Sequence, residues 1–246
     1  LANYFDVGEL TEWGFTDDEL QFYEEEPEEG LIDDDEIPEV EEAITKTGDL
    51  WLLGEHRVLC GDATKKEDVE RLMEGQKADM VFTDPPYGVN LEYNKHNDSD
   101  LDAYFKLAEK TYDILKQHKL SLITTGYKNI IFWLQKNPDD IMVWYNSMKC
   151  SPGKSYYVMK CEQIFIYGKV YNRYNQDYFD FKSELDNGMK GKHPCPKPVA
   201  LIKELISQQK EVKTVLDPFL GSGSTLIACE KTCLLYTSPS PRDRTR

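Results

Sequence analysis

Asp84, two prolines and Tyr87 form a short acidic turn, Asp84-Pro85-Pro86-Tyr87, directly after the apolar run Met80-Val81-Phe82. The run is typical of a buried strand in a parallel sheet. Because the prolines restrict the turn, the carboxylate and the phenol should project beyond the strand's carboxyl end, where open α/β sheets bind ligands. A carboxylate beside a flat ring could hold a planar amine. An isolated Asp-Pro-Pro, in contrast, is most often only a proline turn.

A second strand-and-turn motif lies near the end of the chain. Val215-Leu216 leads into Asp217-Pro218-Phe219-Leu220-Gly221-Ser222-Gly223-Ser224-Thr225, and Leu226-Ile227-Ala228 suits a helix start. Glycines let the backbone approach a ligand, Ser224 or Thr225 could cap the helix, and Asp217 could meet an ammonium group. The loop lacks the Gly-x-x-x-x-Gly-Lys-Ser/Thr pattern of a triphosphate site. Alone, such a glycine turn is often only structural.

With a third motif, His193-Pro194-Cys195-Pro196-Lys197-Pro198, the chain resembles a known family. These are the S-adenosylmethionine-dependent methyltransferases that methylate the amino groups of adenine N6 or cytosine N4 in DNA. The acidic motif precedes the glycine-rich loop, and this order is similar to that of the permuted, β-type group. The resemblance runs from about Gly48 to Thr232, and it rests on three spaced motifs.

The resemblance implies a role for each residue of the acidic turn. Asp84 and the carbonyl of Pro85 would accept hydrogen bonds from the target amino group, Pro86 would keep the turn rigid, and Tyr87 would stack on the target base. An aryl amine is a poor nucleophile, so acceptors that favour a pyramidal nitrogen stabilise the transition state more than the ground state. A base inside a duplex must first be flipped out, at a cost of about a few kcal/mol.

The resemblance also implies a binding site for S-adenosylmethionine. Lys197 and His193 would lie near its methionine end, and Asp62 would contact its adenine. A helix cap for Lys65 to Glu74 is an equally good interpretation of Asp62. Methyl transfer from a sulfonium needs positioning more than acid–base chemistry. The residues that match the family's cofactor loop are Asp217, Phe219, Gly221, Gly223 and Ser224.

The net charge of −16 is concentrated at the start of the chain. Residues 1–49 hold 19 acidic residues against Lys46, whereas residues 145–213 hold 12 Lys and Arg against 7 Asp and Glu, interleaved with tyrosines. Basic and aromatic residues together suit contact with phosphates and bases, although a solvated face is an equally good interpretation for any single residue. In the resembling family this region recognises DNA sequence. We therefore expect target recognition within residues 147–192 and double-stranded DNA as the partner.

The six cysteines and four histidines show no paired metal-ligand spacing, so a zinc site is not expected. Free buried thiols and the lack of a long apolar segment favour a reducing cytoplasm and no membrane partner. The sequence leaves open a homodimer.

Both ends of the chain differ from its middle. Residues 1–47 have the composition of an acidic, largely disordered linker, and residues 233–246 resemble translated sequencing-adapter sequence, with a basic disordered tail as the alternative. We therefore expect a fragment truncated at both ends. Family members continue after Thr232 into an interior strand that ends in an acid holding the cofactor ribose. We expect that strand to be missing, the sheet to have a gap, and cofactor binding to be poor.

These motifs require a scaffold that brings strand ends together. Strand-like runs at Val58-Leu59, 80–83, 120–124 and 214–216 alternate with helical stretches at 101–116 and 199–210. This alternation predicts one three-layer, doubly wound α/β domain over residues 48–232, with a mostly parallel sheet of the Rossmann-like methyltransferase type.

The predicted function is methylation of adenine N6 in DNA. In the resembling family Asp at the first motif position favours adenine, and cytosine-N4 enzymes more often carry Ser there, so cytosine N4 is the nearest alternative. A protein glutamine methyltransferase usually has Asn at that position and the unpermuted motif order. An inactive DNA-binding remnant is the remaining alternative, against which the intact Asp84, Tyr87 and glycine loop argue.

Overall fold

The computed structural model describes residues 45–87, 92–93, 96–97, 101–146, 160–182 and 196–240. The chain divides into two compact units, Leu1–Val40 and Glu41–Arg246, and all described residues belong to the second. Most of the predicted acidic linker, His193, residues 147–159 and 183–192 of the predicted recognition region, and residues 241–246 of the predicted tail lie outside the described residues.

The described elements are nine strands of one sheet, a separate two-stranded ribbon and short and long helices. The sheet strands are β1 (Leu50–Leu53), β2 (His56–Cys60), β3 (Met80–Thr83), β6 (Leu120–Thr125), β7 (Asp140–Tyr145), β8 (Cys161–Gly168), β9 (Tyr178–Asp180), β10 (Thr214–Leu216) and β11 (Leu235–Ser240). The ribbon is β4 (Glu92–Tyr93) and β5 (His96–Asn97). The helices are α3 (Lys66–Met73), α4 (Leu101–Leu115), η1 (Tyr127–Asn129), α5 (Ile130–Leu134), α6 (Val199–Ser207) and α7 (Ser224–Glu230).

The sheet has the strand order β1-β2-β11-β10-β3-β6-β8-β7-β9. Its centre, from β2 to β6, is parallel, whereas β8 runs antiparallel to both β6 and β7. The carboxyl ends of the central strands therefore meet at one edge, and the beginning of β8 joins them there. This edge, which follows Cys60, Thr83, Thr125 and Leu216, is called the carboxyl edge below.

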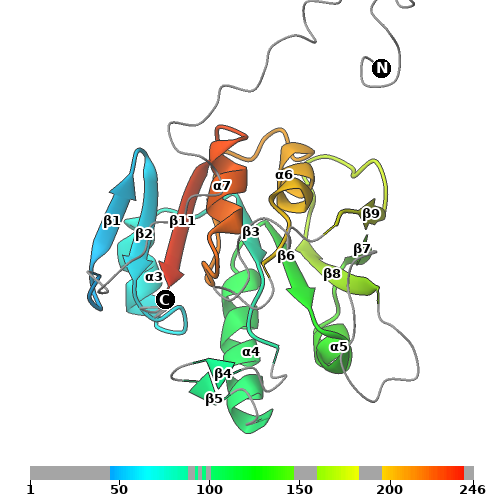
Figure 1. Cartoon of the computed structure of the whole chain (residues 1–246), viewed down its shortest axis with the longest axis horizontal. Coiled ribbons are helices and arrows are strands. Elements are labelled where there is room, and N and C mark those ends of the chain that lie inside the picture. Colours follow the sequence, from blue (N-terminus) through cyan, green and yellow to red (C-terminus); the bar gives the residue numbers. More distant parts are fainter. Residues whose placement is uncertain are drawn as a thin grey trace, which may run out of the picture. The chain divides into compact units, whose positions relative to one another are not determined.

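Helices cover both faces of the sheet (Figure 1). Along β3, Met80 and Phe82 pack into the core under α6 and α7, and Val81 packs into the core shared with α3, α4 and α5. This alternation follows from the two-residue period of a strand, and continuous apolar runs are expected where both faces are buried. The arrangement confirms the predicted three-layer α/β fold with a mostly parallel sheet.

The prediction of a missing interior strand is wrong. β11 lies between β10 and β2 and runs parallel to both, with Thr214 opposite Leu235 and Arg57 opposite Thr237 (Figure 1). Tyr236 is fully buried. Every residue except proline carries a backbone donor and acceptor, so a Ser-rich segment can still complete a sheet, and Pro239, which lacks the N–H, stands next to the last residue of β11. The adapter-like origin of residues 233–246 stays a prediction.

β11 is held in place by a buried histidine. The Tyr236 amide donates to Nδ1 of His56 at 3.0 Å, and Nε2 of the same ring lies 2.6 Å from Oε2 of Glu230. Because Nδ1 accepts, Nε2 carries the proton and donates to Glu230. One ring thus joins β2, β11 and α7. No carboxylate occurs within β11 itself, so the expected ribose-binding acid is absent from this strand.

No helix among the described residues is both long and apolar enough to cross a membrane.

Candidate active site

Asp84 follows β3 at the carboxyl edge. Thr83 pairs with Ile123 in β6, so Asp84 lies beside the next residue, Thr124, whose hydroxyl donates to Asp84 Oδ1. The Tyr87 hydroxyl donates to the same oxygen at 2.5 Å, and Lys197 Nζ lies 2.7 Å from Oδ2. Pro85 is buried and Asp84 and Pro86 are half-buried. The carboxylate therefore has a fixed orientation before any ligand binds.

Tyr87 is fixed at both of its ends. Its hydroxyl also lies 3.0 Å from Lys197 Nζ and 3.2 Å from Glu162 Oε2, and its backbone carbonyl accepts from Asn129 Nδ2 at 2.5 Å. Burial, followed by the negative charges of Asp84 and Glu162, raises the pKa of this phenol well above its usual range. Tyr87 therefore stays protonated and acts as a hydrogen-bond donor.

The Tyr87 ring rests on Gly126, which follows β6. A methyl group added at Gly126 would lie 2.8 Å from Cδ2 of the ring, closer than carbon atoms can approach without displacement. Only glycine leaves room for the aromatic ring at this point. The sequence indicated no such contact, because a single glycine after a strand is a common turn residue.

Lys197 is almost completely buried, yet it is charged. It is 7% exposed, and its ammonium lies 2.7 Å from Asp84 Oδ2 and 3.3 Å from Glu162 Oε2. Burial lowers its pKa, but the charges of Asp84 and Glu162 outweigh that effect and raise the pKa above its ordinary value. The predicted role of Lys197 at the methionine end of a cofactor stays a prediction.

Glu162 was not identified from the sequence. It is the second residue of β8, and an acid at the start of an apolar strand gives no specific signal. Because β8 runs antiparallel to β6, its beginning lies at the carboxyl edge, where Glu162 reaches Tyr87 and Lys197. A prediction of strand direction, which needs the topology, could have identified it.

Asp217 joins the two predicted motifs. Its Oδ1 accepts from Thr83 Oγ1 of β3 and from the amide of Phe219, both at 3.0 Å. Asp217 is 2% exposed, and burial raises its pKa to about 7, although hydrogen bonds from Thr225, the Phe219 amide and Thr83 act in the opposite direction. Its carboxylate thus organises the turn after β10, and the predicted contact with an ammonium group stays a prediction.

The glycine-rich loop uses left-handed backbone conformations. Gly221 has φ 57° and Gly223 φ 85°, values that residues with a side chain rarely adopt. The space beside Gly223 is open, since no atom lies within 4 Å of an added methyl. Backbone at this loop is therefore accessible to a ligand, as a cofactor cradle requires. The expected side-chain cap is wrong, because Gly223 is the N-cap of α7 and Thr225 instead hydrogen-bonds Asp217.

Asp62 lies after β2 and is partly exposed. Its Oδ1 accepts from the Thr64 amide at 2.9 Å and from the Thr64 hydroxyl at 2.7 Å. Burial opposes ionisation, but these hydrogen bonds and the charges of Lys65 and Lys110 lower the pKa of Asp62 below its usual value. The alternative of a helix cap is wrong, since Lys65 is the N-cap of α3 and the Asp62 carboxylate accepts instead from Thr64, which precedes the helix.

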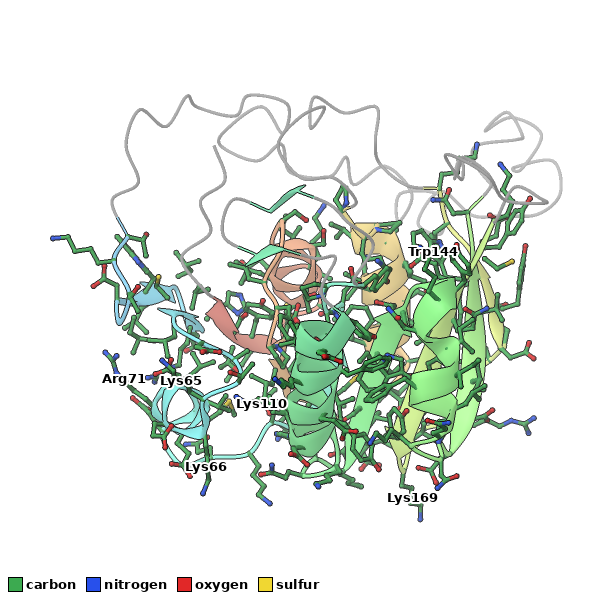
Figure 2. The ribbon with its side chains drawn as sticks, turned by 90° about the horizontal axis from the view of Figure 1, so that it is seen from below. Lys65, Lys66, Arg71, Lys110, Trp144 and Lys169 are labelled. Atoms are coloured by element: carbon green, nitrogen blue, oxygen red, sulfur yellow. The ribbon has the colours of Figure 1, made fainter. Side chains whose placement is uncertain are left out.

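A groove of about 760 Å³ lies between α3 and α4, and the residues of the Asp84 turn do not line it. Figure 2 shows Lys65, Lys66 and Arg71 around α3 and Lys110 on the side of α4 toward α3. Lys66 pairs with Glu70 at 3.2 Å. Such i,i+4 pairs on exposed helix faces are typical of a solvated surface. Among the described residues, no group of three or more His, Cys, Asp or Glu is arranged to hold a metal ion.

The family model described as "DNA methylase", N6_N4_Mtase, matches residues 78–233. The chain belongs to this family of N6/N4 DNA methylases. The matched span contains the Asp84 turn, Glu162, Lys197 and the glycine-rich loop. The Asp84 turn is therefore part of a DNA methylase domain rather than a proline turn that happens to lie at a sheet edge.

Known proteins similar to this DNA methylase include one characterised relative and several solved structures. The chain is 24% identical over 213 residues to the Type II methyltransferase M.HpaI of Haemophilus parainfluenzae, a match that covers 72% of this chain and 67% of that protein. The M1.HpyAVI–SAM complex matches with a TM-score of 0.52 at 23% identity, covering 76% of this chain and 94% of that one. The cytosine-N4-specific PvuII DNA methyltransferase matches with a TM-score of 0.52 at 15% identity, covering 75% and 81%.

A structure of TTHA0409 from Thermus thermophilus, complexed with S-adenosyl-L-methionine, also matches with a TM-score of 0.52. Its identity is 18%, over 75% of this chain and 87% of that one. At these identities the structural matches show a common fold.

Proposed function

We propose that this DNA methylase transfers a methyl group from S-adenosylmethionine to the exocyclic N6 of adenine in double-stranded DNA. The observation that carries the proposal is Asp84, a half-buried carboxylate fixed by Thr124, Tyr87 and Lys197 at the carboxyl edge. A fixed acceptor is what a weakly nucleophilic aryl amine needs in order to react.

At the target base, Asp84 and the carbonyl of Pro85 accept the two N–H groups of the amine, and Pro86 keeps the turn rigid. The developing positive charge on the target nitrogen is stabilised by the Asp84 carboxylate. The Tyr87 ring, supported from below by Gly126, stacks on the flipped base. The methylated nitrogen then loses one proton to solvent.

For the cofactor, the proposed contacts come from the loop after β10 and from Asp62. When bound, S-adenosylmethionine would supply an electrophilic methyl group on a positively charged sulfonium, with a neutral thioether as the leaving group. The open backbone at Gly223 fits close approach of such a ligand, and the ionised Asp62 fits a hydrogen-bond acceptor. The residues proposed to hold the cofactor are Asp62, His193, Lys197, Asp217, Phe219, Gly221, Gly223 and Ser224.

For DNA sequence recognition we narrow the proposal to residues 147–159 and 183–192. These segments follow β7 and β9 in the sequence, and both strands end at the carboxyl edge because they run parallel to each other and antiparallel to β8. Residues 169–175 are unsuitable, because they follow the other end of β8. There Tyr171 donates to the carbonyl of Asp79, which precedes β3, and Lys119 lies over its ring.

The nearest alternative is cytosine N4. One of the similar structures is a cytosine-N4-specific enzyme, and both bases present an exocyclic amine to the same kind of acceptor. Asp84 at the first motif position favours adenine through the family resemblance.

The decisive experiment identifies the methylated nucleoside. The chain is incubated with S-adenosylmethionine and unmethylated duplex DNA, and the digested product is analysed by mass spectrometry. D84N, which keeps the shape of the carboxylate but removes its charge, should lose activity. D113N, which removes a surface carboxylate paired with Lys116, should retain it. Detection of N4-methylcytosine would change the proposed target base from adenine to cytosine. The absence of any methylated base would overturn the proposed activity.

A further inference from the structure

Three charged side chains from distant parts of the chain meet at the candidate active site. Lys197 Nζ lies between Asp84 Oδ2, at 2.7 Å, and Glu162 Oε2, at 3.3 Å. Lys197 and Glu162 are each 7% exposed. Buried charges are costly unless they are paired, so the balance among these three groups must be kept in every state of the site.

The Asp84 carboxylate is already occupied in this arrangement. Tyr87 and Thr124 donate to Oδ1, and Lys197 donates to Oδ2. One of the about four acceptor sites of the carboxylate remains on Oδ2, so a target amine must share that oxygen with the Lys197 ammonium. If Asp84 were the sole partner of Lys197, breaking the contact between them would leave a buried ammonium without a counter-charge. The lysine would then compete with the substrate amine for the Asp84 carboxylate.

The charge of the site also matters for the reaction. With both carboxylates ionised and Lys197 protonated, the three groups sum to one negative charge. The target nitrogen becomes positive as the methyl group is transferred, and a net negative site stabilises that charge. Without Glu162 the remaining pair is neutral, and the ammonium opposes the developing charge.

We propose that Glu162 is a positioning residue that holds the Lys197 ammonium and thereby frees Asp84 Oδ2 to bind the target amine. The proposal rests on the proposed function, since it concerns the same reaction. Glu162 touches neither substrate nor cofactor in this scheme, because it acts through Lys197. Its location follows from the antiparallel direction of β8, which brings the start of that strand to the carboxyl edge.

Two other roles for Glu162 need to be separated from this one. Glu162 could serve only to stabilise the fold, or it could act through Tyr87, whose hydroxyl lies 3.2 Å from Oε2. The role through Tyr87 does not require Lys197, and a purely structural role would lower the stability of the fold rather than kcat. A double-mutant cycle between Glu162 and Lys197 therefore distinguishes them from the proposed role.

The experiment measures kcat and the KM for DNA at saturating S-adenosylmethionine for wild type, E162Q, E162D, K197M and E162Q/K197M. E162Q should lower kcat by about tenfold or more, with little change in KM. This loss in kcat should be smaller than the loss caused by removing a group that contacts the reacting atoms directly. E162D, which retains the charge, should recover most of the loss. In the K197M background, E162Q should change kcat by less than about threefold, because no ammonium remains to be held.

E109Q is the matched control. Glu109 pairs with Lys136 at 2.6 Å on the surface of α4, so this variant removes a Glu–Lys pair away from the site. Its kcat should equal that of wild type. If E162Q alone fails to fold, E162Q/K197M carries the test, since it buries no unpaired ammonium and must match K197M in kcat.

A wild-type chain that methylates DNA while E162Q keeps full kcat overturns this inference and leaves the proposed function standing. An equal loss from E162Q in both backgrounds also overturns it, because Glu162 would then act without Lys197. A wild-type chain that methylates no base overturns the proposed function and this inference together.

Discussion

Lys197 Nζ lies 2.7 Å from Asp84 Oδ2, although 113 residues separate the two in the chain. Asp84 follows the central strand β3, and Lys197 precedes α6, so the contact connects the Asp84 turn with the motif that contains Lys197. The orientation of the Asp84 carboxylate, which is the acceptor in the proposed reaction, thus depends on tertiary contacts as much as on the turn in which Asp84 lies. This relationship makes the behaviour of neighbouring side chains predictable.

The two parts of Tyr87 should have separable effects. Y87A removes the ring and should lower kcat/KM by about tenfold or more, since stacking on a base contributes about 1–3 kcal/mol. Y87F keeps the ring and loses only the hydroxyl, which contacts Asp84, Lys197 and Glu162, so its loss should be smaller than that of Y87A. For each variant, kcat/KM is measured by DNA methylation, and stacking on the base is measured by the fluorescence of a 2-aminopurine at the target position. Equal losses in the two variants would contradict a stacking role.

G126A should disturb the site through the Tyr87 ring. The added methyl would lie 2.8 Å from Cδ2, so the ring must move, and both stability and activity should fall. Thermal unfolding should show a destabilisation of about 1–3 kcal/mol. In the Y87A background the same substitution should cost much less, because the ring is absent. An undiminished cost there would place the strain in the Gly126 backbone instead.

Asp217 should make the stability of the protein depend on pH. Its pKa is raised to about 7 in the folded chain, from 3.8, so the folded state binds the proton more tightly. The stabilisation is complete below pH 4 and is lost as pH rises toward 7, by an amount on the order of 2–4 kcal/mol. D217N removes this dependence and keeps an acceptor oxygen for Thr83 and Phe219.

Urea unfolding of wild type and D217N at pH 5 and pH 8 measures the difference directly. D217N should gain stability relative to wild type at the higher pH. A difference that stays constant with pH would mean that Asp217 titrates normally.

His56 should be needed to keep β11 in the sheet. H56L removes the acceptor of the buried Tyr236 amide and should lower the free energy of unfolding by about 1–3 kcal/mol. E230Q is the control, because Glu230 is 74% exposed and the hydrogen bond that it accepts from His56 should contribute less than about 1 kcal/mol. Hydrogen exchange at the Tyr236 amide should accelerate in H56L only. Unchanged protection of that amide would show that neighbouring strands hold β11 without the histidine.

Features with a local signature were predictable from the sequence. Asp84 and Asp217 each follow a short, continuous apolar run, so their location at the carboxyl edge followed from strand periodicity alone. The helices over 101–115 and 199–207 were found in the same way. Strands and helices with strong apolar patterns can be located in the sequence with little tertiary information.

Features that depend on partners were not predictable. Glu162 is a site residue only because β8 is antiparallel, which nothing in Cys161–Gly168 reveals. Ser224 and Thr225 have the composition of a helix cap, but Gly223 takes that position because Thr225 binds Asp217. β11 has no apolar alternation, and its place is decided by the unpaired backbone of β2 and β10.

The position of β11 has a consequence for the order in which the molecule is assembled. Its neighbours β2 and β10 are never hydrogen-bonded to each other, and the strand that joins them leaves the ribosome after both. During synthesis the β1–β2 hairpin must therefore wait, with one row of peptide groups unpaired, while about 175 residues follow it. Such long-range closure is slow and exposes the nascent chain to aggregation. During synthesis the completion of the sheet should accordingly depend on the docking of this single late strand.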